Sequence, residues 1–166
     1  ILYKNSKTCL VIPEGFESEC LILFRFVIEC SNFSSSINFI LKLHPMMNKE
    51  KFINKFPEFN ILPRNVSWAS TNINNDFSKC NWVLYRGTTM IVEACQNNLI
   101  PIYYQYNINE ISLDILEDVS DYKFTINNVN EFFKTILFEK NKYNKEKIIE
   151  YCSKLFQNFD YTILTN

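Results

Sequence analysis

The stretch from Cys80 to Tyr104, CNWVLYRGTTMIVEACQNNLIPIYY, predicts two strands joined by a helix. Residues 81–85 and 99–104 are short apolar runs rich in β-branched and aromatic residues, which is typical of buried strands. Residues 90–97 between them have helical character, and the asparagines at 97 and 98 end the helix. A strand, a helix and a strand in this order form a βαβ unit, so we expect parallel strands and a right-handed crossover.

The turn between the first strand and the helix, Arg86-Gly87-Thr88-Thr89, carries the chemistry of this unit. Glycine lets the backbone approach a ligand closely, and a helix start offers free N–H groups and a partial positive charge to a phosphate. Arg86 could add a positive charge or point to solvent. Glu93 follows Thr89 by one helical turn, and its carboxylate could bind two ribose hydroxyls. The alternative is an ordinary strand–turn–helix with a threonine cap and a solvated glutamate, because this motif is weak.

A second candidate for the site is His44, the one histidine of the chain. Residues 38–43 predict a strand that runs directly into His44-Pro45, and a proline keeps the residue before it out of helical geometry. His44 and Lys42 therefore share one face at the carboxyl end of a strand, where open parallel sheets bind ligands. The alternative is an ordinary surface or structural histidine.

The remaining sequence alternates strands with helices. We predict further strands at 8–12, 65–69 and 122–126, the last at a sheet edge, and helices at 17–30, 48–56, 108–116, 129–139 and 144–156. Five or six such strands indicate a doubly wound, Rossmann-like α/β sandwich with a mostly parallel sheet and helices on both faces. We expect a single domain over residues 1–166, in which residues 144–166 form a C-terminal helix and tail. Gly15 is assigned to a tight turn or a substrate-facing loop, because the acids of the helix turn that follows disfavour a phosphate there.

Composition narrows the classes of function. The 166 residues are 47% hydrophobic and 21% charged with a net charge of -1, which is typical of a globular domain and gives no support to nucleic-acid binding. The six cysteines include no C-x-x-C pair, and one histidine cannot complete a common zinc site, so we expect no metal. Their apolar neighbours predict reduced, buried thiols in a cytoplasmic protein. No run approaches the roughly 18 apolar residues that span a bilayer.

Two separated motifs can be interpreted together: Lys42-Leu43-His44-Pro45 at a strand end, and Tyr85-Arg86-Gly87-Thr88-Thr89 followed by Glu93-Ala94 at a helix start. The pair resembles the carboxyl-terminal, nucleotide-sugar-binding half of GT-B glycosyltransferases. It is most similar to enzymes that make bacterial surface polysaccharides, including the sialyltransferase-like and glycerophosphotransferase-like branches. The resemblance extends over roughly residues 8–136, and its motifs lie in the right order on the right elements.

The resemblance implies a role for each residue of the two motifs. His44 would be the catalytic residue, contacting the donor phosphate or stabilising charge on the departing nucleotide, and Glu93 would bind the ribose. The phosphate would be bound by Lys42, Arg86, Gly87, Thr88 and Thr89. Such contacts act by stabilising the leaving diphosphate or monophosphate as the glycosidic bond breaks. The nucleotide-sugar is the donor substrate, and no metal or cofactor is implied.

The chain also departs from a complete GT-B enzyme, which has two Rossmann-like domains around a cleft. The acceptor site and the catalytic base usually come from the N-terminal domain, which is missing from this chain. The glycine-rich tract of some relatives is reduced here to Gly87, so the donor nucleotide stays open. Because the chain begins at Ile1 without a leader pattern, we expect a piece of a longer protein. It would be inactive alone, and any peripheral membrane association would be made through the full-length protein.

Two alternatives stay open. A nucleotide-sugar 2-epimerase shares the architecture, but it would need a richer serine-glycine phosphate loop and more catalytic acids than this sequence offers. A non-catalytic Rossmann-like interaction module would leave His44 and Glu93 as surface residues. The sequence also leaves open whether Tyr103, Tyr104 and Tyr106 stack on a base or pack in the core, as well as the sugar, the acceptor, the stereochemistry and the oligomeric state.

Overall fold

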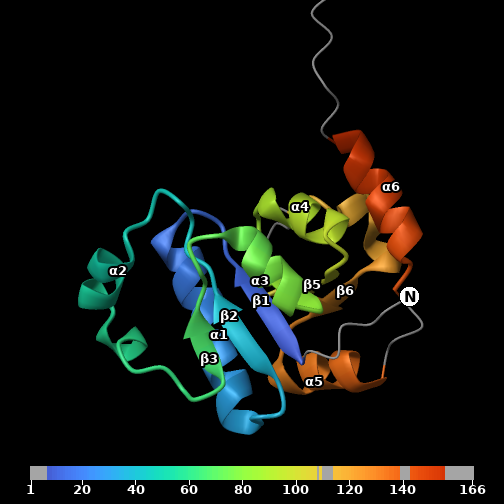
Figure 1. The fold of residues 1–166 in the computed structure, drawn as a ribbon. Coiled ribbons are helices and arrows are strands. Elements are labelled where there is room, and N and C mark those ends of the chain that lie inside the picture. The colour runs from blue at the N-terminus through green and yellow to red at the C-terminus, as the bar shows by residue number, and fades with distance from the viewer. Residues whose placement is uncertain (1–6, 108, 110–113, 139–142, 156–166) are drawn as a thin grey trace, which may run out of the picture.

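The computed structural model describes residues 7–107, 109, 114–138 and 143–155. Figure 1 shows strands and helices alternating along the chain. The strands are β1 (Thr8–Ile12), β2 (Asn38–Leu41), β3 (Val66–Trp68), β4 (Trp82–Tyr85), β5 (Ile100–Tyr104) and β6 (Phe124–Ile126). The α-helices are α1 (Glu17–Phe33), α2 (Lys49–Lys55), α3 (Ile73–Lys79), α4 (Met90–Gln96), α5 (Val129–Phe138) and α6 (Lys145–Leu155), and the 3-10 helices are η1 (Pro57–Phe59) and η2 (Glu117–Tyr122).

The six strands form one sheet in the order β3-β2-β1-β4-β5-β6, and every pair of neighbours is parallel. This is the doubly wound arrangement that the sequence predicts. The β4–α4–β5 unit is confirmed, with Val83 opposite Pro101 and Tyr85 opposite Tyr103. The predicted edge strand is confirmed as β6, which is shorter than expected because Tyr122 ends η2. The predicted helix over 108–116 lies largely outside the described residues.

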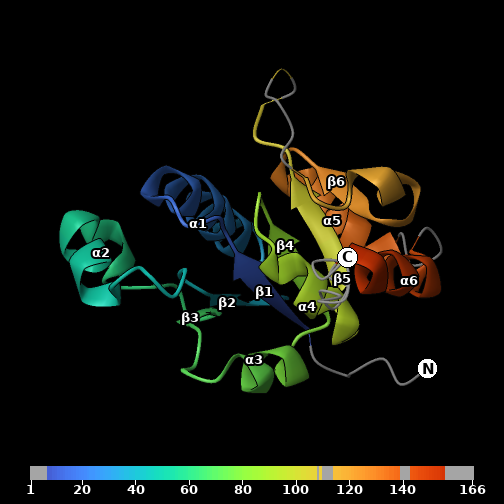
Figure 2. The same cartoon turned by 90° about the horizontal axis from the view of Figure 1, so that it is seen from above.

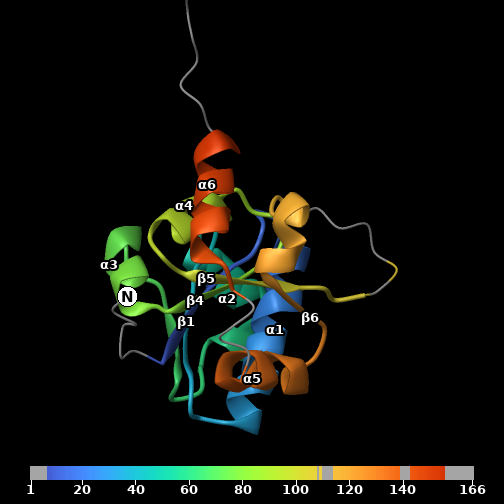
Figure 3. The ribbon, with the colours of Figure 1, turned by 90° about the vertical axis from the view of Figure 1, so that its right-hand side faces the viewer.

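Helices cover both faces of the sheet, as Figure 2 and Figure 3 show. Side chains alternate along β1, so Cys9 and Val11 pack with residues of α1 and α5 on one face. Leu10 and Ile12 pack with residues of α3, α4 and α6 on the other. Strands buried on both faces account for the continuous apolar runs in the sequence.

The cysteines and two of the three tyrosines in question belong to this core. All six cysteines are buried and free, as predicted. Tyr104 stacks on Phe26 with ring centroids 4.0 Å apart, and Tyr103 packs edge-on against Tyr85. Tyr106, beyond β5, is 58% exposed. Within the described part of the chain, no helix is long and apolar enough to cross a membrane.

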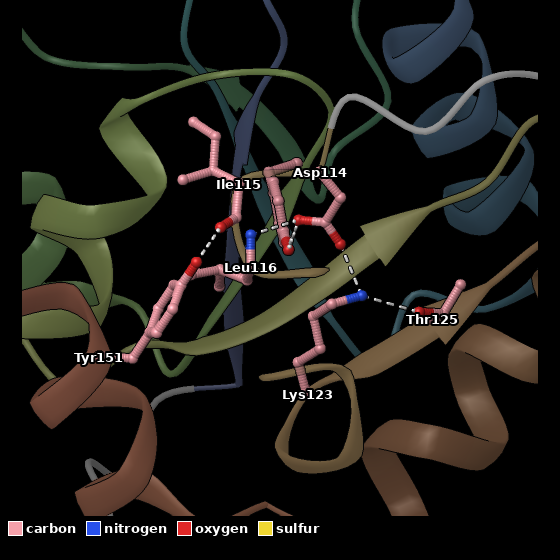
Figure 4. Close-up of polar contacts among 7 residues, drawn as sticks. Asp114, Ile115, Leu116, Lys123, Thr125 and Tyr151 are labelled. Atoms are coloured by element: carbon pink, nitrogen blue, oxygen red, sulfur yellow. Dashed lines mark hydrogen bonds and ion pairs between the residues drawn. The ribbon is translucent and has the colours of Figure 1, made fainter. Parts of the chain in front are cut away.

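A network of buried polar side chains lies on the β5–β6 side of the sheet (Figure 4). Lys123 Nζ lies 2.5 Å from Asp114 Oδ2, and both side chains are almost completely buried. Lys123 also donates to Thr125 Oγ1 at 3.1 Å. The Tyr85 hydroxyl and the Leu116 N–H both donate to Asp114 Oδ1, at 2.6 and 3.0 Å. Asp114 therefore joins the end of β4 to the segment before β6, and burial together with the Asp114 charge raises the pKa of Tyr85.

We expect Lys123→Met to lower the free energy of unfolding by about 3–5 kcal/mol, because it leaves the Asp114 carboxylate buried without its cation. Urea denaturation measures the change. The matched control is Lys154→Met, which removes the exposed pair of Lys154 with Glu150 on α6 and should cost less than about 1 kcal/mol. Equal losses in the two variants would show that the buried pair has no special importance.

Candidate functional site

Three loops meet at the carboxyl edge of the sheet: residues 13–16 after β1, 42–48 after β2 and 86–89 after β4. They touch at both glycines of the chain. A Cβ on Gly15 would lie 3.1 Å from the His44 ring, and a Cβ on Gly87 would lie 2.7 Å from Glu14 Oε2. The two motifs identified in the sequence therefore converge, with the β1–α1 loop between them.

A pocket of about 330 Å³ opens at this edge. Its lining includes four of the predicted site residues, His44, Thr88, Thr89 and Glu93. The other lining residues are Pro45, Met90, Val92 and Gln96. Lys42, Arg86 and Gly87 are not among the lining residues. The structure thus brings together one histidine, two threonines and one carboxylate from elements far apart in the sequence.

His44 is half-buried in the loop that follows β2, because β2 ends at Leu41 and is shorter than the strand predicted over residues 38–43. The backbone N–H of Met46 donates to its Nδ1 at 3.3 Å. In the neutral imidazole a nitrogen that accepts a hydrogen bond carries no proton, so the proton lies on Nε2. His44 can therefore offer Nε2–H as a donor to an anion or an oxygen in the pocket.

The start of α4 is held by Thr88 rather than Thr89. Thr88 Oγ1 accepts from the Met90 N–H at 3.4 Å, and the Thr88 carbonyl accepts from the Ile91 N–H at 3.3 Å. Thr89 has helical backbone angles, and its side chain makes no capping bond. A threonine cap, the ordinary structural explanation for this motif, thus accounts for Thr88 alone and leaves the Thr89 hydroxyl available to the pocket.

Glu93 lies one turn beyond Thr89 on α4, with its side chain exposed. Gln96 follows three residues later, so both side chains lie on the pocket side of the helix. Among the residues that the structure describes, no ion pair to the Glu93 carboxylate is recorded. A carboxylate without a cation beside it can accept hydrogen bonds from two adjacent hydroxyls.

Arg86 faces neither the pocket nor solvent. Its side chain is buried, Nε donates to Glu19 Oε2 at 2.7 Å, and Nη1 donates to the Tyr104 carbonyl at 2.9 Å. Glu19 lies in the first turn of α1, and Tyr104 ends β5. The guanidinium is thus directed toward the α1 side of the sheet, and it is not among the groups that line the pocket.

Glu14 lies beside the Gly87 turn, although it is not among the residues that line the pocket, and the sequence analysis did not single it out. It is half-buried in the β1–α1 loop, and its carboxylate rests against Gly87. The signal was present in Pro13-Glu14-Gly15, which follows a buried strand just as His44-Pro45 does. The acids in the first turn of α1 disfavour a phosphate at this loop. They do not disfavour a hydroxyl ligand, which carries no charge.

We expect Gly87→Ala to destabilise the protein by about 1–2 kcal/mol, because Gly87 has a φ of +57° and the new methyl group would meet Glu14. Urea denaturation is the measurement. The double variant Glu14→Ala/Gly87→Ala removes the contact but keeps the left-handed backbone, so it separates the two causes. A Gly87→Ala variant as stable as the parent would show that the turn does not need this conformation.

No family model matches the sequence, and no curated protein matches it. Solved structures do match. The C-terminal CMP-Kdo binding domain of WaaA from Acinetobacter baumannii matches with a TM-score of 0.56 and 11% identity, over 93% of this chain and 91% of that one. The C-terminal domain of the glycosyl transferase group 1 family protein LpcC from Francisella tularensis matches with a TM-score of 0.56 and 9% identity, over 89% and 84%.

The UDP-GlcNAc 2-epimerase from Neisseria meningitidis, bound to UDP-GlcNAc, matches with a TM-score of 0.56 and 14% identity over 99% of this chain. The chain spans 46% of that epimerase and 31% of TarM, another match. It therefore has the length of a domain in these larger proteins. The Rossmann-like fold of this chain is that of the C-terminal half of GT-B glycosyltransferases, as the sequence motifs predict.

Proposed function

We propose that this chain is the donor-binding domain of a glycosyltransferase, which transfers a sugar from a nucleotide-sugar to a surface polysaccharide or another glycan acceptor. The observation that carries the proposal is the convergence of His44, Thr88, Thr89 and Glu93 on one pocket. This pocket lies at the carboxyl edge of a doubly wound parallel sheet, where such folds bind ligands.

Each of these four residues has a chemical part in the proposal. The donor phosphate lies between His44 and the Thr88-Thr89 turn, where Nε2–H, a hydroxyl and backbone N–H groups are within reach of its oxygens. The ribose lies against Glu93, whose carboxylate accepts from its hydroxyls. As the glycosidic bond breaks, negative charge gathers on the departing phosphate, and donors fixed beforehand stabilise it. Lys42 adds charge from the loop after β2, and Gly87 leaves room at the turn. No metal or cofactor is part of this proposal.

Glu14 has a different part, because a carboxylate disfavours a phosphate. It lies beside both the phosphate turn and, through Gly15, the His44 ring. We propose that it accepts the proton of an attacking hydroxyl as the acceptor displaces the nucleotide. The acceptor itself binds to a second, N-terminal domain of the same cytoplasmic protein, and this chain does not turn over alone.

A second candidate function is that of a nucleotide-sugar 2-epimerase half. The epimerase match favours it, since it covers 99% of this chain and contains UDP-GlcNAc. Both candidates place a nucleotide-sugar in the same pocket. Conversion of UDP-GlcNAc to its 2-epimer by the full-length protein, without an acceptor, would favour the epimerase.

We expect one of CMP, CDP, UDP and GDP to bind this chain selectively, because the pocket offers donors for phosphate and an acceptor for ribose. Calorimetric titration is the measurement. His44→Ala and Glu93→Ala should each weaken binding about tenfold or more, as expected for lost hydrogen bonds to charged groups. Glu50→Ala, in the first turn of α2, is the control and should bind like the parent. Unchanged binding in both pocket variants would remove the site assignment and leave a non-catalytic module.

We expect Glu14→Gln to tighten binding of the same nucleotide by about two- to fivefold, because it removes a negative charge near the phosphate. In the full-length enzyme the same variant should lose sugar transfer. The paired titrations and transfer assays measure both effects. Full transfer by the Glu14→Gln enzyme would show that another group accepts the proton.

A further inference from the structure

We propose that Arg86 is a positioning residue, which holds the Gly87-Thr88-Thr89 turn in its ligand-binding conformation from behind. This inference rests on the proposed nucleotide binding. Arg86 is the residue directly before the turn, and its side chain is directed into the α1 layer rather than into the pocket. It would act on the ligand only through the backbone that follows it.

The guanidinium joins three structural elements. Nε donates to Glu19 Oε2 at 2.7 Å in the first turn of α1, and Nη1 donates to the Tyr104 carbonyl at the end of β5. Only 8% of the Arg86 side chain and 22% of the Glu19 side chain are exposed. The rigid fork of an arginine can bind these two partners at once, whereas the single ammonium of a lysine cannot match both directions. The residue that follows β4 is therefore hydrogen-bonded both to the end of the neighbouring strand β5 and to the first turn of α1.

The turn benefits from such an anchor because both hydrogen bonds to Thr88 are long, although the Thr89 carbonyl accepts from the Val92 N–H at 3.1 Å. The bonds from Met90 N–H to Thr88 Oγ1 and from Ile91 N–H to the Thr88 carbonyl measure 3.4 and 3.3 Å, near the upper limit for this interaction. Gly87 has the most permissive backbone of any residue type. Arg86 directly precedes Gly87, and its side chain is held by both Glu19 and the Tyr104 carbonyl.

The β1–α1 segment thus contacts the turn twice. Glu19 holds Arg86, while Glu14 rests against Gly87. A buried ion pair is weak evidence for stability, because apolar residues of the same shape often serve as well. An ion pair directly beside the pocket has a clear purpose if it sets the orientation of the Thr88 and Thr89 hydrogen-bond donors. Such donors bind a ligand well only within a narrow range of positions.

A double-mutant cycle on nucleotide binding tests the inference, with Arg86→Met, Glu19→Gln and the combined variant. We expect each single variant to weaken binding of the selected nucleotide about tenfold, since displaced donors lose much of their effect. The combined variant should bind no more weakly than Arg86→Met, because Arg86 acts through Glu19. Titrations are made well below each thermal midpoint, so a loss of stability alone leaves the dissociation constant unchanged.

Arg25→Met is the matched control. It breaks a 2.7 Å arginine–glutamate pair with Glu58 that is exposed to solvent, and it should bind like the parent. Should Arg86→Met fail to fold, Glu19→Gln still decides, because it removes the carboxylate charge from the pair while the Tyr104 carbonyl still accepts from Arg86 Nη1.

Failure of the inference is distinct from failure of the proposed function. If the parent chain binds no nucleotide, the proposed function fails and Arg86 has nothing to position. If the parent binds and Glu19→Gln binds equally well, the inference alone is overturned. Losses from the two single variants that add in the combined variant also overturn it, since Arg86 and Glu19 would then affect binding independently of each other.

Discussion

The pairing of β1 with both β2 and β4 is the constraint on which the rest of this structure depends. The chain runs outward from β1 through β2 to β3, then returns to β4 on the other side of β1. The connections that follow β1 and β4 pass over opposite faces of the sheet, and this is the point where such folds bind ligands. Gly15 lies against the His44 ring and Gly87 against Glu14 at this edge, so the loops after β1, β2 and β4 are in close contact there.

One buried ion pair and one partly buried ion pair support this edge in different ways. Asp114 and Lys123 lie beside β6 and hold the Tyr85 hydroxyl, so they fix the body of β4. Arg86 and Glu19 lie on the other face and fix its end. The last residue of β4, Tyr85, and the residue that follows it, Arg86, are thus held in opposite layers, because successive side chains of an extended backbone point to opposite faces. The Gly87 turn follows directly, so its starting point is held from both faces of the sheet.

The pocket combines two kinds of polar group. His44 and the Thr88-Thr89 turn offer hydrogen-bond donors, while Glu93 and Gln96 offer acceptors and an amide. A nucleotide needs both kinds of group, because its phosphate oxygens accept hydrogen bonds and its ribose hydroxyls donate them. An interaction module would not require this combination, whereas a nucleotide-sugar site of either a transferase or an epimerase would.

The sequence by itself determined the alternation of strands and helices, the parallel β4–α4–β5 unit and the placement of His44 at a strand end. These follow from local apolar periodicity and from the backbone limits of glycine and proline, which act within a few residues. Only the tertiary structure decided the direction of Arg86, the place of Glu14 against Gly87 and the pairing of Asp114 with Lys123. Each depends on partners distant in sequence or on the path of an intervening loop, and the local pattern carries no information about which buried charges will meet.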